Sequence, residues 1–319
     1  MRLTVSESVL TAVCYADVFD YPLTEDEVVQ WCVGRTLSAS QVKRTLEAVT
    51  NGGASNQNAP QVFFLKGRRA ILRKRRIRSL ASQRKFLYAR KKSQLYRLIP
   101  SVLLVGVTGG VAAGNADPED DIDLFFIVSD GTLWVSRFLI TVVTELFARR
   151  RRPNTAVLTD SLCLNMFLTD SSLRLPEVDC DLYSAHEILS MSPLWEYEGV
   201  YRKFLSRNLW VTSFFPSAWN ERMNELDAEV QGWKTYPRTH KSVIWIPAGA
   251  VIFAFRRMEW LFAYFQKLYM KPRVTREVIT PFVLRFHPQD IRTWLRVELA
   301  KRLTKLNIPL DKVFYGRLK

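Results

Sequence analysis

The 319-residue chain has few of the residues that build zinc-thiolate sites, disulfide frameworks or histidine-based active sites. Its four cysteines are scattered and form no CxxC pair, so neither a zinc site nor a disulfide framework is indicated. The three histidines, His186, His240 and His287, lie far apart, and none has HxxxH spacing. We therefore expect the histidines to be packing or surface residues, and the cysteine pattern fits a reducing compartment.

The chain also lacks a long apolar segment. Its N-terminus does not show the charged-then-apolar pattern of a signal peptide, which favours a cytoplasmic protein. The run Val243–Phe255 is too short to span a bilayer, and Arg256, Arg257 and Glu259 follow it directly. We interpret this run as a buried helix. A helix lying on a membrane surface is the alternative, so a membrane partner is not our first expectation.

Positive charge is plentiful but uneven. The formal net charge is +15, and the segment from Lys66 to Arg97 contains fourteen lysines and arginines and no acid, so the rest of the chain is close to neutral. Such a stretch could contact the phosphates of a nucleic acid. The alternative is a solvated helix face that a partner neutralises.

The first 72 residues predict three short helices followed by a hairpin, which is the order of elements in a winged helix. Helix starts are indicated at Ser6, at Thr24, which would form a capping box with Glu27, and at Ser38 or Ser40. Residues 62–65 and 70–72 are the expected strands of the hairpin.

Residues 73–175 have the pattern of an α/β (α+β) domain. A long basic helix is expected from Arg73 to Leu98, and aliphatic runs predict buried strands. The predicted strands are Val102–Val107, Ile122–Val128 and Leu162–Leu168, with a helix over Leu133–Phe147. From about Pro176 to residue 319 the apolar spacing is helical, so we expect a helical C-terminal region.

The segment from Val107 to Val128 contains the residues that point to chemistry. Asp121 and Asp123 alternate along a strand, so both carboxylates face the same side. Two acids there are costly to bury unless a cation lies between them, and Mg²⁺ is the usual cation beside phosphates. Gly109 and Gly110 follow a buried strand and open a short helical turn, where backbone N–H groups can approach an anion. A phosphate site beside a metal pair suits displacement at a nucleotide phosphorus.

This segment resembles the active-site signature of the nucleotidyltransferase superfamily, whose fold is like that of DNA polymerase beta. The matching positions are Gly109, Ala112, Gly114, Asp121 and Asp123, whereas Gly110 and Asp120 stand where the family usually has serine. The resemblance implies an enzyme that moves a nucleoside monophosphate from a nucleoside triphosphate to an acceptor, with Mg²⁺ on Asp121 and Asp123.

The resemblance extends to further segments shared with a bacterial and archaeal branch of that superfamily, in which a winged helix comes first. Those segments are 20–24, 164–165, 182–187, 208–211 and 286–290. They identify no acceptor, base preference or oligomeric state.

A third carboxylate is usual on a later strand in this family, but the matching strand here offers Asn165. Asp160 and Asp170 flank the strand as substitutes. The predicted site therefore has Asp121, Asp123 and Asn165 as catalytic residues, and its phosphate-binding residues are Thr108, Gly109, Gly110 and Gly114. An asparagine can ligate a metal but cannot act as a general base. The alternative function is a nucleic-acid-binding regulator with a degenerate transferase domain.

Overall fold

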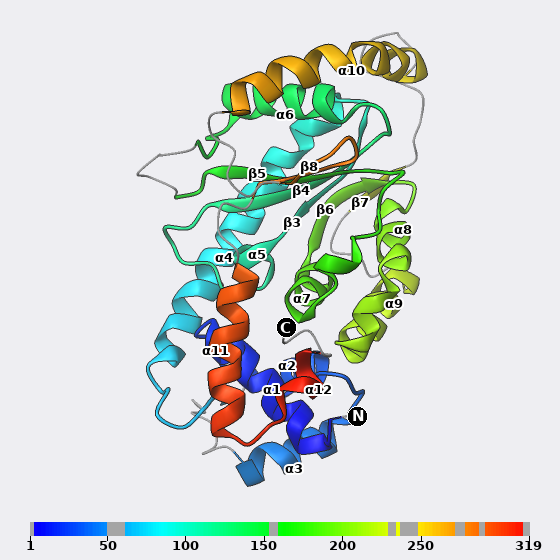
Figure 1. Cartoon of the computed structure of the whole chain (residues 1–319). Helices are drawn as coiled ribbons and strands as arrows, with labels where there is room; N and C mark the ends of the chain where they lie inside the picture. Colours follow the sequence, from blue (N-terminus) through cyan, green and yellow to red (C-terminus); the bar gives the residue numbers. More distant parts are fainter. Residues whose placement is uncertain are drawn as a thin grey trace.

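A computed structural model describes residues 3–49, 61–152, 159–228, 234–236, 248–271, 278–286 and 291–314. Its centre is a seven-stranded mixed sheet in the order β7-β6-β3-β4-β5-β9-β8 (Figure 1). The strands are β3 (Val102–Val107), β4 (Ile122–Val128), β5 (Leu162–Thr169), β6 (Ser192–Tyr197), β7 (Lys234–Tyr236), β8 (Val278–Ile279) and β9 (Val283–Arg285). β3 pairs antiparallel with β4, and β4 pairs parallel with β5. The bounds predicted for β3 and β4 are confirmed, and the prediction for β5 was one residue short.

Helices cover both faces of this sheet. On one face lie α4 (Ile71–Ser93), η1 (Gln94–Leu98) and α6 (Leu133–Phe147); on the other lie α7 (Leu182–Ser190), α8 (Val200–Arg207), η3 (Leu209–Ser213) and α9 (Pro216–Asp227). Along β4, Leu124 and Phe126 point into the core between the sheet and the α4–α6 layer. Phe125 and Ile127 point into the core between the sheet and the α7–α9 layer. Because side chains alternate along a strand, Asp123 faces the side of α7.

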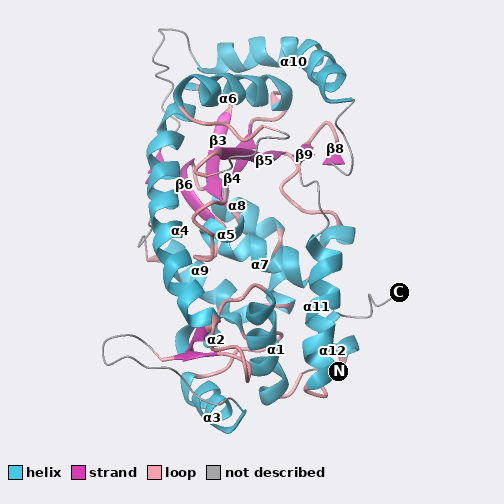
Figure 2. Ribbon diagram, turned by 90° about the vertical axis from the view of Figure 1, so that its left-hand side faces the viewer, coloured by secondary structure: helices cyan, strands magenta, loops and turns pink. Residues whose placement is uncertain are grey.

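The N-terminal helices form a third core at one end of the molecule (Figures 1 and 2). They are α1 (Val5–Val18), α2 (Glu25–Trp31) and α3 (Ala39–Val49), with β1 (Leu23–Thr24) and β2 (Val62–Phe63) beside them. The predicted capping box of Thr24 with Glu27 is confirmed, and Thr4 with Glu7 forms another at the start of α1. Close to the C-terminus, α11 (Ile291–Lys305) returns to pack along α1, and α12 (Leu310–Phe314) follows it.

The predicted hairpin of residues 62–65 with 70–72 is wrong. β2 pairs instead with β1, where Leu23 lies opposite Phe63. Residues 71 and 72 open α4, and the Ile71 N–H donates to the Arg68 carbonyl at 3.0 Å. The reason is that Ile71 and Leu72 directly precede a long run of strong helix formers, and they become the first residues of that helix.

The prediction of a helical C-terminal region is confirmed only in part, because β6, β7, β8 and β9 also come from it. β6 lies between β3 and the edge strand β7, so the predicted boundary at residue 176 passes through one continuous sheet. Periodicity cannot distinguish a short apolar run such as 192–197 from part of a buried helix. Residues 192–197 form a strand because they pair with β3, which lies far away in the sequence.

The apolar run that we expected to be a buried helix belongs to α10 (Ala248–Met270), and residues 243–247 lie outside the described part. α10 packs on the outer side of α6, and Met270 is its one buried residue. The expectation of a buried helix is therefore wrong, because α10 is a second layer over α6 rather than a helix between layers. Within the described residues, no helix combines the length and apolarity that a bilayer crossing requires.

Candidate functional site

The two aspartates predicted to bind metal lie side by side at the start of β4. A carboxylate oxygen of Asp121, one of Asp123 and the sulfur of Cys163 all lie within 4.8 Å of one another. Cys163 comes from β5, where it is the register partner of Asp123. The end of β3 meets the same point, because the Thr108 N–H donates to the Asp123 carbonyl at 3.0 Å. The three strands at the centre of the sheet thus bring this cluster together.

Gly109 lies in contact with the Asp123 side chain and has φ +64°. A Cβ atom at this position would lie 2.9 Å from Asp123 Oδ2. Glycine is therefore required twice, by the left-handed backbone and by the close approach of the carboxylate.

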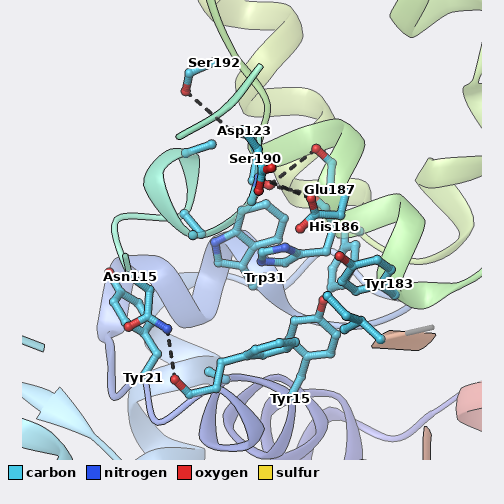
Figure 3. Close-up of a pocket in the computed structure, with 18 of the residues that line it drawn as sticks. Tyr15, Tyr21, Trp31, Asn115, Asp123, Tyr183, His186, Glu187, Ser190 and Ser192 are labelled. Carbon is cyan, nitrogen blue, oxygen red and sulfur yellow. Dashed lines mark hydrogen bonds between the residues drawn. The ribbon is translucent and has the colours of Figure 1, made fainter. Parts of the chain in front are cut away.

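Glu187 is a carboxylate that the sequence analysis did not assign to the site. It lies on α7, and its Oε2 accepts a hydrogen bond from the Gly109 N–H at 3.3 Å. Burial, then the charge of Asp123, raises the pKa of Glu187 to about 7. Figure 3 shows Asp123 and Glu187 at the same end of a cavity. No local sequence signal identifies Glu187, because only the packing of α7 against the sheet brings it to Asp123.

Asp123 has a raised pKa. Burial, followed by the charge of Asp121, raises the pKa of Asp123 to about 7. Asp121 has a cation of its own, since Arg151 Nη1 lies 2.6 Å from its Oδ2. A divalent cation beside Asp123 would relieve this repulsion and favour the ionised carboxylate.

Arg151 is a second residue whose role at the site was not predicted. No function was predicted for the arginines at positions 149–152, which follow α6. Arg150 and Arg152 pair with Glu145, whereas the Arg151 N–H donates to the Leu162 carbonyl. That backbone bond holds Arg151 beside β5, so its guanidinium reaches into the site.

The predicted catalytic residue Asn165 lies on β5, buried, in the wall of the cavity that contains Asp123. It falls within the register shift between β4 and β5. Its two proposed substitutes lie elsewhere: Asp160 pairs with Lys85 at 3.0 Å, and Asp170 accepts from the Asp130 N–H at 2.8 Å. Neither lines this cavity. Glu187, rather than either flanking aspartate, is thus the further carboxylate beside the pair.

The predicted phosphate-binding residues divide into two sets. Gly109 and Gly110 line the cavity, whereas Thr108 and Gly114 lie outside its lining. The short helical turn predicted after the buried strand is α5 (Gly109–Ala112). A Cβ at Gly110 would lie 3.3 Å from the Ala116 Cα, so the serine usual in the family would crowd the following loop.

The cavity has a volume of about 550 Å³ and lies between the acidic cluster and the N-terminal helices. Its far wall is aromatic: Tyr15, Phe19, Tyr21, Trp31 and Phe215 line it. Figure 3 shows Tyr15 and Tyr21 at the end opposite to Asp123, with Trp31 and His186 between them. A cavity of this size is in the range of small-molecule sites.

His186 is a packing residue in this wall, as the sequence analysis expected. Its ring centroid lies 4.3 Å from that of Trp31 and 5.0 Å from that of Tyr15. Burial lowers its pKa to about 4, so the ring is neutral at physiological pH. Residues 240 and 287 lie outside the described part of the chain.

The side chains at the cluster fit a hard divalent cation with one departure. Two carboxylates supply the oxygen ligands that Mg²⁺ prefers, and a third carboxylate, Glu187, is close. The Cys163 thiol is a soft donor that Mg²⁺ does not favour, and burial, then the charge of Asp123, raises its pKa well above the usual value. A protonated Cys163 would therefore stay outside the first coordination sphere of Mg²⁺.

Compared with known protein families, with curated proteins and with solved structures, the chain matches none of them.

Proposed function

We propose that this chain is a Mg²⁺-dependent nucleotidyltransferase that uses a nucleoside triphosphate. The observation that carries the proposal is the cluster of Asp121 and Asp123 against the Gly109 backbone, with Glu187 beside it. The sequence resemblance to the nucleotidyltransferase signature points the same way. In this proposal Asp121 and Asp123 hold the cation.

Bound there, Mg²⁺ supplies charge neutralisation for the triphosphate oxygens and for the leaving pyrophosphate. Arg151 offers a guanidinium at the edge of the same cluster, and its forked N–H groups suit phosphate oxygens. Moving Arg151 from Asp121 to a phosphate would free that carboxylate for the cation.

Glu187 is our candidate for the proton acceptor, the role that the family usually gives to a third carboxylate. Its pKa of about 7 suits a general base at neutral pH, because the group can hold a proton and release it. Asn165 cannot do this, since an amide does not take up a proton.

The aromatic wall supports the nucleotide half of the proposal. Trp31 and Tyr15 offer ring faces in the cavity that also contains Asp123. The Tyr15 hydroxyl is buried and, within the described residues, lacks a hydrogen-bond partner, so a polar group of a ligand could bind it. A base against this aromatic wall and a triphosphate at the carboxylates would use both ends of the cavity.

The test is calorimetry with each of the four ribonucleoside triphosphates, with and without Mg²⁺. We expect one or more to bind in the presence of Mg²⁺. In Asp123→Asn the affinity should fall roughly a hundredfold or more, because a carboxylate ligand of the cation is lost. Asp170→Asn is the matched control, since Asp170 lies outside the cavity, and it should bind as the wild type does. Metal-independent binding, or full binding by Asp123→Asn, would remove the proposal.

A nucleic acid is a second proposed partner, through the exposed part of the basic segment from Lys66 to Arg97. Six of the fourteen lysines and arginines in this segment form ion pairs within the chain: Arg68, Lys74, Arg75, Arg78, Arg84 and Lys85. Exposed arginines such as Arg69, Arg73 and Arg76 have no ion pair in the described part of the chain. Salt-dependent binding of duplex DNA or RNA that Arg73→Ala with Arg76→Ala weakens would support this partner.

A further inference from the structure

The outer side of α10 is a row of exposed aromatic and apolar side chains. Phe253, Trp260, Tyr264 and Leu268 follow one another at helical spacing, and Phe265 lies next to them; all five are exposed. We call these five residues the α10 face. Figures 1 and 2 show α10 as the outermost layer at the end of the molecule opposite to the N-terminal helices. Large aromatic groups are seldom left in water without a role.

The inner side of α10 is fixed to α6 by specific contacts. Both oxygens of the Glu259 carboxylate accept backbone N–H groups at the start of α6, from Trp134 at 2.8 Å and from Val135 at 3.1 Å. Gln266 Nε2 donates to the Trp134 carbonyl at 2.8 Å. These contacts determine which side of α10 is turned outward. Because Glu259 and Gln266 bond to α6, the opposite, aromatic side of α10 faces the solvent.

The same contacts give this end of the molecule one sign of charge. Glu259 is the sole acid in α10, and it is turned inward, whereas Arg257 and Lys267 are exposed. In α6 the sole acid, Glu145, is paired with Arg150 and Arg152. Cations therefore accompany the aromatic row without an unpaired carboxylate from either helix.

α6 continues the apolar surface beside α10. Phe138, Val142, Leu146 and Phe147 are exposed on it, and Phe138 packs against Phe262 of α10 with ring centroids 4.9 Å apart. The two helices thus both expose apolar side chains at this end of the molecule, and α10 adds basic ones.

We infer that the α10 face docks the protein on an anionic lipid bilayer. Trp and Tyr side chains favour the interface between lipid and water, and arginine and lysine bind anionic headgroups. A second copy of this chain fits less well, because a symmetric contact would bring Arg257 and Lys267 of both copies together with no unpaired carboxylate of α6 or α10. A nucleic acid strand also fits less well, because an outward helix face with aliphatic residues offers no groove for the phosphate backbone of that strand.

The experiment is flotation of the full chain with vesicles of phosphatidylcholine alone, or with about one third phosphatidylglycerol, at low and high salt. We expect binding to the anionic vesicles to be roughly tenfold or more tighter than to neutral ones, and to weaken with salt. Trp260→Glu, and separately Arg257→Glu, should each reduce vesicle binding by about tenfold or more.

Val178→Glu is the matched control, because Val178 is 75% exposed, close to the 71% of Trp260, but belongs to η2 (Glu177–Asp179) outside this surface. It should bind vesicles as the wild type does. Equal loss in all three variants, or no flotation of the folded wild type, would overturn the inference. So would concentration-dependent dimerisation, or RNA binding, that Trp260→Glu abolishes while vesicle binding persists. Nucleotide binding in Trp260→Glu should be unchanged, which separates this test from that of the proposed enzyme.

Discussion

Two groups of buried or half-buried acids in this molecule differ in what neutralises them. Asp179 lies between Arg285 and Arg292, and Asp17 lies between Arg68 and Arg302. Burial alone would raise the pKa of Asp179, but hydrogen bonds and charge from Arg292 and Arg285 bring it below its usual value.

Asp123 and Glu187 have the opposite arrangement. Burial is the largest influence on each pKa. The charge of Asp121 adds to it at Asp123 and the charge of Asp123 adds to it at Glu187, so both pKa values rise to about 7. The arginine pairs of Asp17 and Asp179 join elements that are far apart in the sequence. Asp123 and Glu187 instead lie at a cavity, where a cation or a proton could neutralise them.

The largest effect on stability should come from breaking an arginine-paired acid. Asp179→Asn removes the negative charge between two arginines, and we expect it to lower the free energy of unfolding by about 3–4 kcal/mol. Urea unfolding at pH 7 measures this loss. Asp170→Asn, at an exposed residue of the same region, should change the unfolding free energy by less than about 0.5 kcal/mol. An equally stable Asp179→Asn variant would contradict the structural role assigned to these pairs.

The next effect concerns the glycine beside the unpaired acids. Gly109→Ala should cost about 2–3 kcal/mol of unfolding free energy, because the new methyl group adds a collision with Asp123 to the left-handed strain. Gly199→Ala is the matched control: Gly199 has φ +66°, but a Cβ there meets nothing within 4 Å. It should cost about 1 kcal/mol, from strain alone. Chemical denaturation of both variants gives the difference, and equal costs would mean that Gly109 does not press on Asp123.

A smaller effect of opposite sign is expected when an unpaired acid is neutralised. The pKa of Asp123 rises from an ordinary 3.8 to about 7 in the folded state, so its contribution to stability is present below pH 3.8 and lost as pH rises through 7. Without divalent metal, Asp123→Asn should therefore be more stable than the wild type at pH 8, by on the order of 2 kcal/mol, and should lose this advantage near pH 4. Thermal unfolding in chelator across that range is the measurement. A variant less stable than the wild type at pH 8 would show that Asp123 has a compensating cation.

The smallest effect tests whether the two unpaired acids influence each other. Glu187→Gln removes a negative charge beside Asp123 and should lower the pKa of Asp123 in the folded state, so the loss of stability with rising pH ends at a lower pH and is smaller. The expected change in unfolding free energy at pH 8 is a gain of about 1 kcal/mol. A pH profile identical to that of the wild type would mean that Glu187 lies too far from Asp123 to act with it.

Much of the central sheet was predictable because its signals are local. Uninterrupted aliphatic runs gave the bounds of β3 and β4, and the helical period gave α6. The alternation of Asp121 and Asp123 predicted that both carboxylates share a face, and their oxygens do lie within the cluster of 4.8 Å. The capping box of Thr24 and Glu27 is equally local, since the two residues are three apart.

The rest of the site depended on residues remote in the sequence. The hydrogen bond from Gly109 to Glu187 joins residues 78 positions apart, and Arg151 reaches Asp121 across 30. Neither pair has a local signal, so the sequence pointed to Asn165 instead.

The sequence by itself determined the two-aspartate strand, the glycine turn before it and the helix after it, because backbone periodicity and side-chain alternation are properties of neighbouring residues. Only the tertiary structure decided that β6 joins the sheet, that Glu187 lies near Asp123 and that α10 turns its aromatic side outward. Those outcomes depend on which surfaces pack together, and packing energy is shared among residues that the sequence keeps far apart.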